Sequence, residues 1–330
     1  MSTPAPLLEI DGLRLETGSP EAPVRIVDEV GLTVRPGEVL GLVGESGSGK
    51  SLTMRAVLGL LPGGVRATAG RVRWAGEDLL TASGARLREV RGGEVGMVFQ
   101  DPAQALDPLM RVGDHIVETL RLHDRELSRR EARSRAVEAL AAVGVPDPER
   151  RARQYPHEFS GGMKQRAMIA VALANRPRLV IADEPTTALD VTIQAQVLDL
   201  LRTARDDLGT AVVLITHDLG LVAEIADRVA VMYAGGVVEV GPVQALFDDP
   251  QHPYTRGLLA SRPHLAARGA ALPAIGGQPP LPAGRPGGCA FHPRCPLALD
   301  TCRTQVPVLE LHGPGHHAAC HLSAPEGALR

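Results

Sequence analysis

An apolar run that ends in a glycine-rich loop constrains this 330-residue chain more than any other feature. Residues 38–43 (EVLGLV) read as a buried strand, and residues 51–61, after the loop, carry apolar side chains at helical spacing. The loop fits the pattern G-x-x-x-x-G-K-[ST], whose glycines let the backbone wrap closely round phosphates at the start of a helix. Its residues are Gly44, Glu45, Ser46, Gly47, Ser48, Gly49, Lys50 and Ser51.

These residues predict a phosphate-binding loop rather than a chance Gly-Ser loop. Lys50 can reach the β- and γ-phosphates of a nucleotide, and the Ser51 hydroxyl can bind Mg²⁺. A second apolar segment, residues 179–182, delivers two carboxylates at its end. We expect Asp183 to hold Mg²⁺ and Glu184 to orient or deprotonate the attacking water. An ordinary acidic cap on a strand is the alternative, and the phosphate-binding loop argues against it.

A Ser-Gly-Gly sequence before a helical run predicts a second phosphate contact. Ser160 offers a hydroxyl, and Gly161 and Gly162 offer unobstructed N–H groups at the N-terminus of a helix. This half-site has no lysine of its own, which suggests that each of the two half-sites is completed by another subunit. A serine that only caps the helix, followed by flexible glycines, is the alternative interpretation.

The remaining pattern predicts the fold class. Strands that alternate with helices indicate an α/β fold with a mostly parallel sheet. The strand segments are 94–99, 178–182 and 211–215, the helical segments are about 102–172 and 191–207, and the strands of a hairpin are 228–232 and 237–240.

Bulk properties argue against several classes of partner. The formal net charge of −3 gives no general electrostatic attraction to nucleic acid or anionic lipid. The longest purely apolar run, residues 167–174, is far shorter than the roughly 18 residues that a membrane-spanning helix needs. The N-terminus lacks a basic region followed by an apolar stretch and does not read as a secretory signal. We therefore expect a protein that stays in the cytoplasm.

All four cysteines lie in a short tail after a linker-like segment, residues 263–288, which has six prolines and six glycines. A tail this small cannot bury a core of its own and needs a disulfide or a bound metal to stabilise its fold. Disulfides are disfavoured in the cytoplasm, and zinc stays open, although its sites more often show tight C-x₂₋₄-C knuckles. The wide spacing favours a [4Fe–4S] cluster. The proposed ligands are Cys289, Cys295, Cys302 and Cys320; the nearby His292, His312, His316, His317 and His321 are expected to be solvated, although one could replace a cysteine.

Together these motifs resemble the nucleotide-binding domain of ABC transporters. In that family's order they are Walker A at 44–51, the Q-loop at Gln100, the signature at 159–163, Walker B at 179–184, the D-loop at Ala188-Leu189-Asp190 and the switch histidine at His217. The resemblance covers about residues 7–250. It implies a P-loop NTPase fold with a mostly parallel sheet, an antiparallel β subdomain and a helical subdomain at about 102–172. It also implies ATP and Mg²⁺ as cofactors.

The resemblance also assigns roles to single residues. It implies that Gln100 binds Mg²⁺ and passes on the state of the γ-phosphate, which His217 contacts. ATP would lie between two subunits, so that Ser160, Gly161 and Gly162 complete the partner's site. One position departs from the family: Thr17 stands where an aromatic side chain commonly stacks on adenine.

Features outside the ATPase motifs narrow the resemblance. The signature FSGGM, the segment PQHPYTRGLL at 250–259 and the segment CAFHPRCP at 289–296 resemble ATP-binding subunits of oligopeptide, dipeptide and nickel importers. This implies peptide uptake by a complex at the cytoplasmic face of the membrane, with a paralogous ATPase as heterodimer partner, two permeases and an extracytoplasmic binding protein. The resemblance also implies an iron–sulfur cluster in the tail.

Other functions and the domain limits complete the predictions. A subunit for nickel or another small solute, an exporter half, a non-catalytic cassette and a soluble ABC ATPase acting on DNA or the ribosome stay as alternatives. No basic extension or coiled-coil insertion supports the last of these, and we expect no nucleic-acid partner. The expected parts are an ABC ATPase domain at 1–250, a Pro/Gly-rich connection at 251–288 and a Cys-rich metal-binding extension at 289–330.

Overall fold

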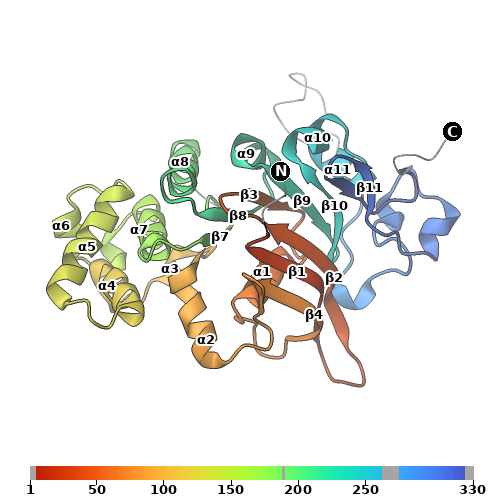
Figure 1. Ribbon diagram of the computed structural model, residues 1–330. Helices are drawn as coiled ribbons and strands as arrows, with labels where there is room; N and C mark the ends of the chain where they lie inside the picture. Colours follow the sequence, from red (N-terminus) through yellow and green to blue (C-terminus); the bar gives the residue numbers. More distant parts are fainter. Residues whose placement is uncertain (1–4, 188–189, 262–274, 324–330) are drawn as a thin grey trace. The chain divides into compact units, whose positions relative to one another are not determined.

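The computed structural model describes residues 5–187, 190–261 and 275–323 (Figure 1). The chain divides into two compact units. Within these described ranges, no helix combines the length and the apolar character that crossing a membrane requires. The first unit comprises Met1–Pro6, Val34–Val39 and Thr81–Ile215, and the second comprises Leu7–Thr33, Leu40–Leu80 and Thr216–Arg330.

A parallel sheet forms the core of the first unit. β7 (Leu179–Asp183) pairs in parallel with β6 (Val95–Val98) on one side and with β8 (Ala211–Thr216) on the other. Every residue of β7 and β8 is buried. A parallel sheet is usually covered on both faces, which explains why these strands read as continuous apolar runs. The three buried strands expected from the sequence are therefore confirmed.

Helices make up most of the rest of the first unit. α4 lies against α5, and α5 lies against α7 (Figure 1). Ser128 starts α5 because its hydroxyl accepts a hydrogen bond from the N–H of Glu131. The helical segment expected at about 102–172 is thus a set of separate helices. They are α3 (Pro102–Ala105), α4 (Val112–His123), α5 (Arg129–Ala142), α6 (Pro148–Arg151) and α7 (Gly161–Leu173); α2 (Gly84–Glu89) precedes them and α8 (Val191–Leu208) follows β7.

An antiparallel sheet forms one part of the second unit. Its strands lie in the order β2-β1-β4-β5, and β1 and β4 pair from Leu8 opposite Trp74 to Glu16 opposite Arg66. Trp74, the last residue of β4, is fully buried. The family resemblance implied this subdomain, whereas the apolar patterns read from the sequence did not include it. The strands are β1 (Leu8–Thr17), β2 (Val24–Val34), β4 (Arg66–Trp74) and β5 (Glu77–Asp78).

Five further strands in the described part of this unit lie side by side, from β3 (Val39–Val43), which precedes the glycine-rich loop, to the strands of the C-terminal tail. β3 runs parallel to β9 (Arg228–Tyr233), which forms the expected hairpin with β10 (Gly236–Pro242). The tail adds β12 (His316–Ala318) to β10, and β11 (Glu310–Gly313) to β12. The helices of this unit are α1 (Lys50–Val57), α9 (Leu219–Ile225), α10 (Val243–Asp248) and α11 (Pro253–Ala260).

The tail is therefore packed against the rest of the second unit. Phe291, Cys302 and Ala318 are buried in it. Short 3₁₀ turns, η5 (His292–Arg294) and η6 (Asp300–Arg303), carry the chain between the cysteines. Of the connection expected at 251–288, residues 253–260 form α11, while residues 262–274 lie outside the described part of the chain.

Candidate functional site

The glycine-rich loop follows β3 in the second unit and leads into α1. Gly44 has a φ of 149°, and a Cβ there would lie 2.1 Å from the carbonyl oxygen of Met232. Gly49 has a φ of 100° and precedes the first residue of α1. Only glycine fits both conditions without strain, because it has no Cβ and tolerates a positive φ. The two glycines therefore let the loop backbone pack closely, as a phosphate-binding loop requires.

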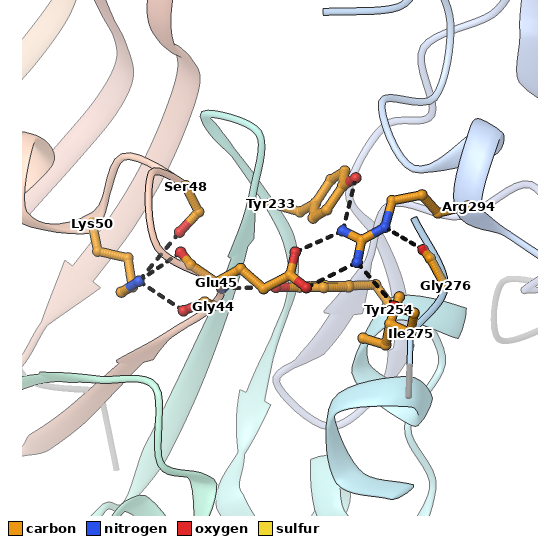
Figure 2. Close-up of polar contacts among 9 residues, drawn as sticks. All are labelled: Gly44, Glu45, Ser48, Lys50, Tyr233, Tyr254, Ile275, Gly276 and Arg294. Atoms are coloured by element: carbon orange, nitrogen blue, oxygen red, sulfur yellow. Dashed lines mark hydrogen bonds and ion pairs between the residues drawn. The ribbon is translucent and has the colours of Figure 1, made fainter. Parts of the chain in front are cut away.

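Lys50 is buried inside this loop. Its ammonium group donates hydrogen bonds to the carbonyl oxygens of Gly44 at 2.7 Å and Glu45 at 2.9 Å, and to the Ser48 hydroxyl at 3.4 Å (Figure 2). Ser51 follows in the first turn of α1. A buried ammonium surrounded by loop oxygens, next to a hydroxyl and a helix N-terminus, suits a nucleotide phosphate with its Mg²⁺.

The carboxylates predicted at the end of β7 lie in the first unit. Asp183 is buried with 1% of its surface exposed. Glu184 has a φ of 47°, an uncommon conformation for a residue with a side chain, and its N–H donates to the carbonyl oxygen of Ile215 at 2.9 Å. Such backbone strain is frequent at functional sites, where surrounding contacts hold it in place.

Gln100 and Glu184, 84 residues apart in the chain, lie together. The Gln100 amide donates a hydrogen bond to Glu184 Oε2 at 3.1 Å, and the Thr187 hydroxyl donates to the same oxygen at 2.8 Å. The sequence predicted the first two residues as site members and missed Thr187. Its only signal was its place three residues after Glu184.

The signature segment begins α7, also in the first unit. The Ser160 hydroxyl accepts a hydrogen bond from the N–H of Met163 at 3.3 Å, so Ser160 caps the helix as the alternative interpretation required. Gly161 and Gly162 lie in the first turn and border a hollow of about 510 Å³. Capping does not exclude phosphate contact, because the N–H groups of the first turn still face outward. Asp190 of the predicted D-loop also borders this hollow, as do Arg166 and Ile193, which the sequence reading did not assign to the site.

Two further motifs follow the sheet strands. Asp190 caps α8 by accepting a hydrogen bond from the N–H of Ile193 at 3.0 Å, whereas Ala188 and Leu189 lie outside the described residues. His217 is exposed directly after β8 and belongs to the second unit. Thr17 ends β1, which contains no aromatic residue.

The four cysteines are all described, and none of them forms a disulfide. The N–H of Cys289 donates to the carbonyl oxygen of Cys302 at 2.8 Å. Burial raises the pKa of the Cys289 thiol, and negative charge on Cys302, Cys320 or Cys295 raises that pKa further. Among the described residues, no group of three or more His, Cys, Asp or Glu side chains is arranged to hold a metal ion.

One expectation about the tail is wrong. His316 is not solvated: its side chain is 6% exposed, and Nε2 lies 2.8 Å from Oε1 of the buried Glu239. A polar side chain was expected to face solvent, but the β12–β10 pairing covers it.

Comparison with known proteins identifies the family. A family model described as "ABC transporter" matches residues 27–187, and one described as "Oligopeptide/dipeptide transporter, C-terminal region" matches residues 238–302. The chain is 51% identical over 316 residues to a putative peptide import ATP-binding protein of Brucella abortus, which covers 96% of this chain and 95% of that protein. The chain belongs to the ABC transporter ATP-binding proteins.

Other relatives agree. The dipeptide transport ATP-binding protein DppD of Escherichia coli is 47% identical over 315 residues, or 96% of each chain. Among solved structures, the ATP-binding cassette MJ0796, in a dimeric post-hydrolysis state with ADP and Pi, superposes with a TM-score of 0.65 at 28% identity. That match covers 72% of this chain and 98% of the cassette. This chain is therefore an ABC-type ATP hydrolase that uses ATP and Mg²⁺, with the ABC ATPase fold.

Proposed function

We propose that this ABC ATPase powers an importer of di- or oligopeptides. The observation that carries the proposal is the match of residues 238–302 to the C-terminal region of oligopeptide and dipeptide transporters. This segment lies outside the catalytic motifs, so it distinguishes importer classes that share one ATPase chemistry. The names of the Brucella and Escherichia relatives support the same solute class.

Uptake of labelled peptides tests the proposal. Cells that lack this gene should lose uptake of labelled di- or oligopeptides, and the wild-type gene should restore it, whereas a Glu184→Gln gene should not. Nickel uptake, measured in the same cells, is the matched control. Unchanged peptide uptake with a loss of nickel uptake would show instead that the alternative solute is the right one.

In the proposed cycle the residues of this chain have separate tasks. Lys50 and the loop N–H groups bind the phosphates, while Ser51, Gln100 and Asp183 offer the oxygen ligands that Mg²⁺ prefers. Mg²⁺ supplies neutralisation of the charge that develops on the phosphates. Glu184 orients or deprotonates the water, and the hydrogen bonds from Gln100 and Thr187 orient its carboxylate.

His217 contacts the γ-phosphate in this proposal, and the signature of a second subunit closes the site. Ser160, Gly161 and Gly162 of this chain would do the same for the partner, which we propose is a paralogous ATPase. Two permeases and an extracytoplasmic binding protein would complete the complex at the cytoplasmic face of the membrane. If the isolated chain forms a stable homodimer with full ATPase activity, the heterodimer is excluded.

We also propose that the extension at 289–330 holds a [4Fe–4S] cluster on its four cysteines, with zinc as the rival. The proposal is supported by the donor chemistry, since cysteine thiolates are the usual ligands of such clusters, and by the hydrogen bond from the Cys289 N–H to the carbonyl oxygen of Cys302, which brings two of the four residues together. Anaerobic purification followed by visible absorption and metal analysis decides between them. A colourless protein with one zinc and no iron excludes the cluster, and a metal-loaded, folded Cys295→Ser variant excludes Cys295 as a ligand.

A further inference from the structure

Arg294 of the C-terminal extension reaches the phosphate-binding loop within the second unit. Its guanidinium donates to both carboxylate oxygens of Glu45, from Nη1 to Oε2 at 2.6 Å and from Nη2 to Oε1 at 2.9 Å (Figure 2). The two residues are 249 positions apart in the chain. Such a two-bond contact fixes geometry as well as charge. The Arg294 side chain is only 5% exposed, so water screens the pair weakly.

The other groups around Arg294 hold its guanidinium in one position. Nε donates to the carbonyl oxygen of Gly276 at 2.8 Å, Nη1 to the Tyr233 hydroxyl at 3.3 Å and Nη2 to the carbonyl oxygen of Ile275 at 3.4 Å. The guanidinium also lies 5.7 Å from the ring centre of Tyr233 and 5.9 Å from that of Phe291. Arg294 is therefore a rigid part of the extension.

The backbone of Glu45 is fixed as well. Its N–H donates to the hydroxyl of Tyr254 at 2.8 Å, and its carbonyl oxygen accepts from Lys50 Nζ at 2.9 Å. Burial raises the pKa of Tyr254, so this hydroxyl stays neutral. One loop residue thus contacts the extension through its carboxylate, α11 through its N–H and the phosphate-binding lysine through its carbonyl.

An aromatic cluster supports these contacts. Tyr233 lies 4.7 Å from Tyr254 and 5.2 Å from Phe291, and Tyr254 lies 5.4 Å from Phe291, measured between ring centres. The chain has four Phe, three Tyr and one Trp, so three of its eight large aromatic residues lie in this cluster. Aromatic rings bury much area with few rotatable bonds, which makes them suitable as a rigid platform.

We infer that Arg294 is a positioning residue of the ATP site: the extension neutralises Glu45 and holds it in place, and thereby sets the charge and shape of the phosphate-binding loop. Without Arg294, the Glu45 carboxylate would lie unneutralised in the loop that binds a triphosphate, and like charges repel. The extension is then a working part of the nucleotide site whichever solute the complex carries.

Nucleotide binding to the full chain tests this inference. A fluorescent ATP analogue with Mg²⁺ should bind Arg294→Ala roughly tenfold more weakly than the wild type, within the usual range of coupling between two sites. Arg294→Lys should recover part of the loss, because lysine restores charge without the planar fork. In the assembled complex the KM for ATP should rise with little change in kcat, because Glu184 and His217 are untouched.

The decisive variant is Arg294→Ala combined with Glu45→Gln. It removes the repelling charge, so it should bind ATP more tightly than Arg294→Ala alone, which a purely structural role of Arg294 does not predict. Arg303→Ala is the matched control: Arg303 also lies in the extension, but its side chain is 68% exposed and its ion pair, at 4.0 Å, is with Asp300 of the same 3₁₀ turn, so its loss should leave binding unchanged. Wild-type affinity in Arg294→Ala, or a folded double variant no better than the single one, overturns the inference.

Discussion

Removing the Glu239 side chain should separate β12 of the extension from β10. Glu239 lies in β10 with none of its surface exposed, and its carboxylate contacts Nε2 of His316 in β12 at 2.8 Å. It also accepts hydrogen bonds from the N–H groups of Gln251 at 2.7 Å and His252 at 2.9 Å. Glu239→Ala leaves these three partners without their acceptor, and two of them, His252 and His316, are buried.

The size of the effect follows from this burial. Leaving a buried donor without its acceptor typically costs about 1–3 kcal/mol, and Glu239→Ala does this to more than one donor, so its cost should be about 3 kcal/mol or more. Glu239→Gln keeps an acceptor oxygen and the shape of the side chain, so its cost should be nearer to that of an altered hydrogen bond, about 1–3 kcal/mol. A loss of about 3 kcal/mol in local stability corresponds to a roughly 100-fold faster exchange of the protected amides.

Hydrogen exchange measures this loss directly. The N–H of Ala319, which follows β12, donates to the carbonyl oxygen of Val238 in β10 at 2.8 Å, so its exchange reports the separation of these two strands. Arg25→Ala is the control, since Arg25 is half exposed and 3.6 Å from Glu16, a kind of pair worth about 1 kcal/mol or less. If Ala319 exchanges at the wild-type rate in Glu239→Ala, the buried pair does not hold the extension and the reasoning fails.

Three further predictions concern the site and the pH response. Glu184→Gln should keep ATP binding and lose about 10²- to 10⁴-fold in turnover, measured as phosphate release from a complex whose second ATP site is disabled. Gly44→Ala should abolish nucleotide binding, because its Cβ would meet the Met232 carbonyl at 2.1 Å, whereas Gly63→Ala, with nothing within 4 Å, should bind normally in the same titration. Acid should separate β12 from β10. The pKa of Glu239 is lower in the native state than in the unfolded chain, so its ionised carboxylate stabilises the fold above the unfolded-state pKa, and this stabilisation is lost as pH falls through the lowered native pKa. Hydrogen exchange of the Ala319 N–H measures the loss.

The lowered pKa of Glu239 determines whether stability rises or falls with pH. Burial alone would raise the pKa, but hydrogen bonds from His316 and from the N–H groups of Gln251 and His252 outweigh burial and hold it below its usual value. The native state therefore binds this proton less readily than the unfolded chain does, and stability rises with pH across that window. If the protection factor of the Ala319 N–H, which corrects for the pH dependence of intrinsic amide exchange, does not fall on acidification through that window, the assignment is wrong.

The sequence was sufficient for the parts of the fold whose signal is local. β7 and β8 were found because buried parallel strands are continuously apolar, and the loop after β3 was found because its glycines follow a fixed spacing. β1 and β4 were not read from their pattern, because neither is a continuous apolar run: β1 mixes buried with partly exposed residues, and in β4 only Val72 and Trp74 are buried.

Contacts between distant segments were the part that the sequence could not supply. Nothing near Arg294 marks it as a partner of Glu45, and nothing near His316 marks it as buried against Glu239. Pairings of this kind depend on which strands become neighbours. The hydrogen bond from Thr187 to Glu184 was also missed, although these two residues are only three positions apart in the sequence.

The pairing of β12 with β10 also changes which strand ends the sheet. Without the extension, the seven residues of β10, most of them buried, would form an open edge with unpaired N–H and C=O groups. Such edges template pairing with other chains. With the extension, the last strand is β11, only four residues long and carrying Glu310 and His312. A chain shortened to its ATPase motifs should therefore be prone to aggregation, so the extension also keeps the cassette from self-association through its sheet.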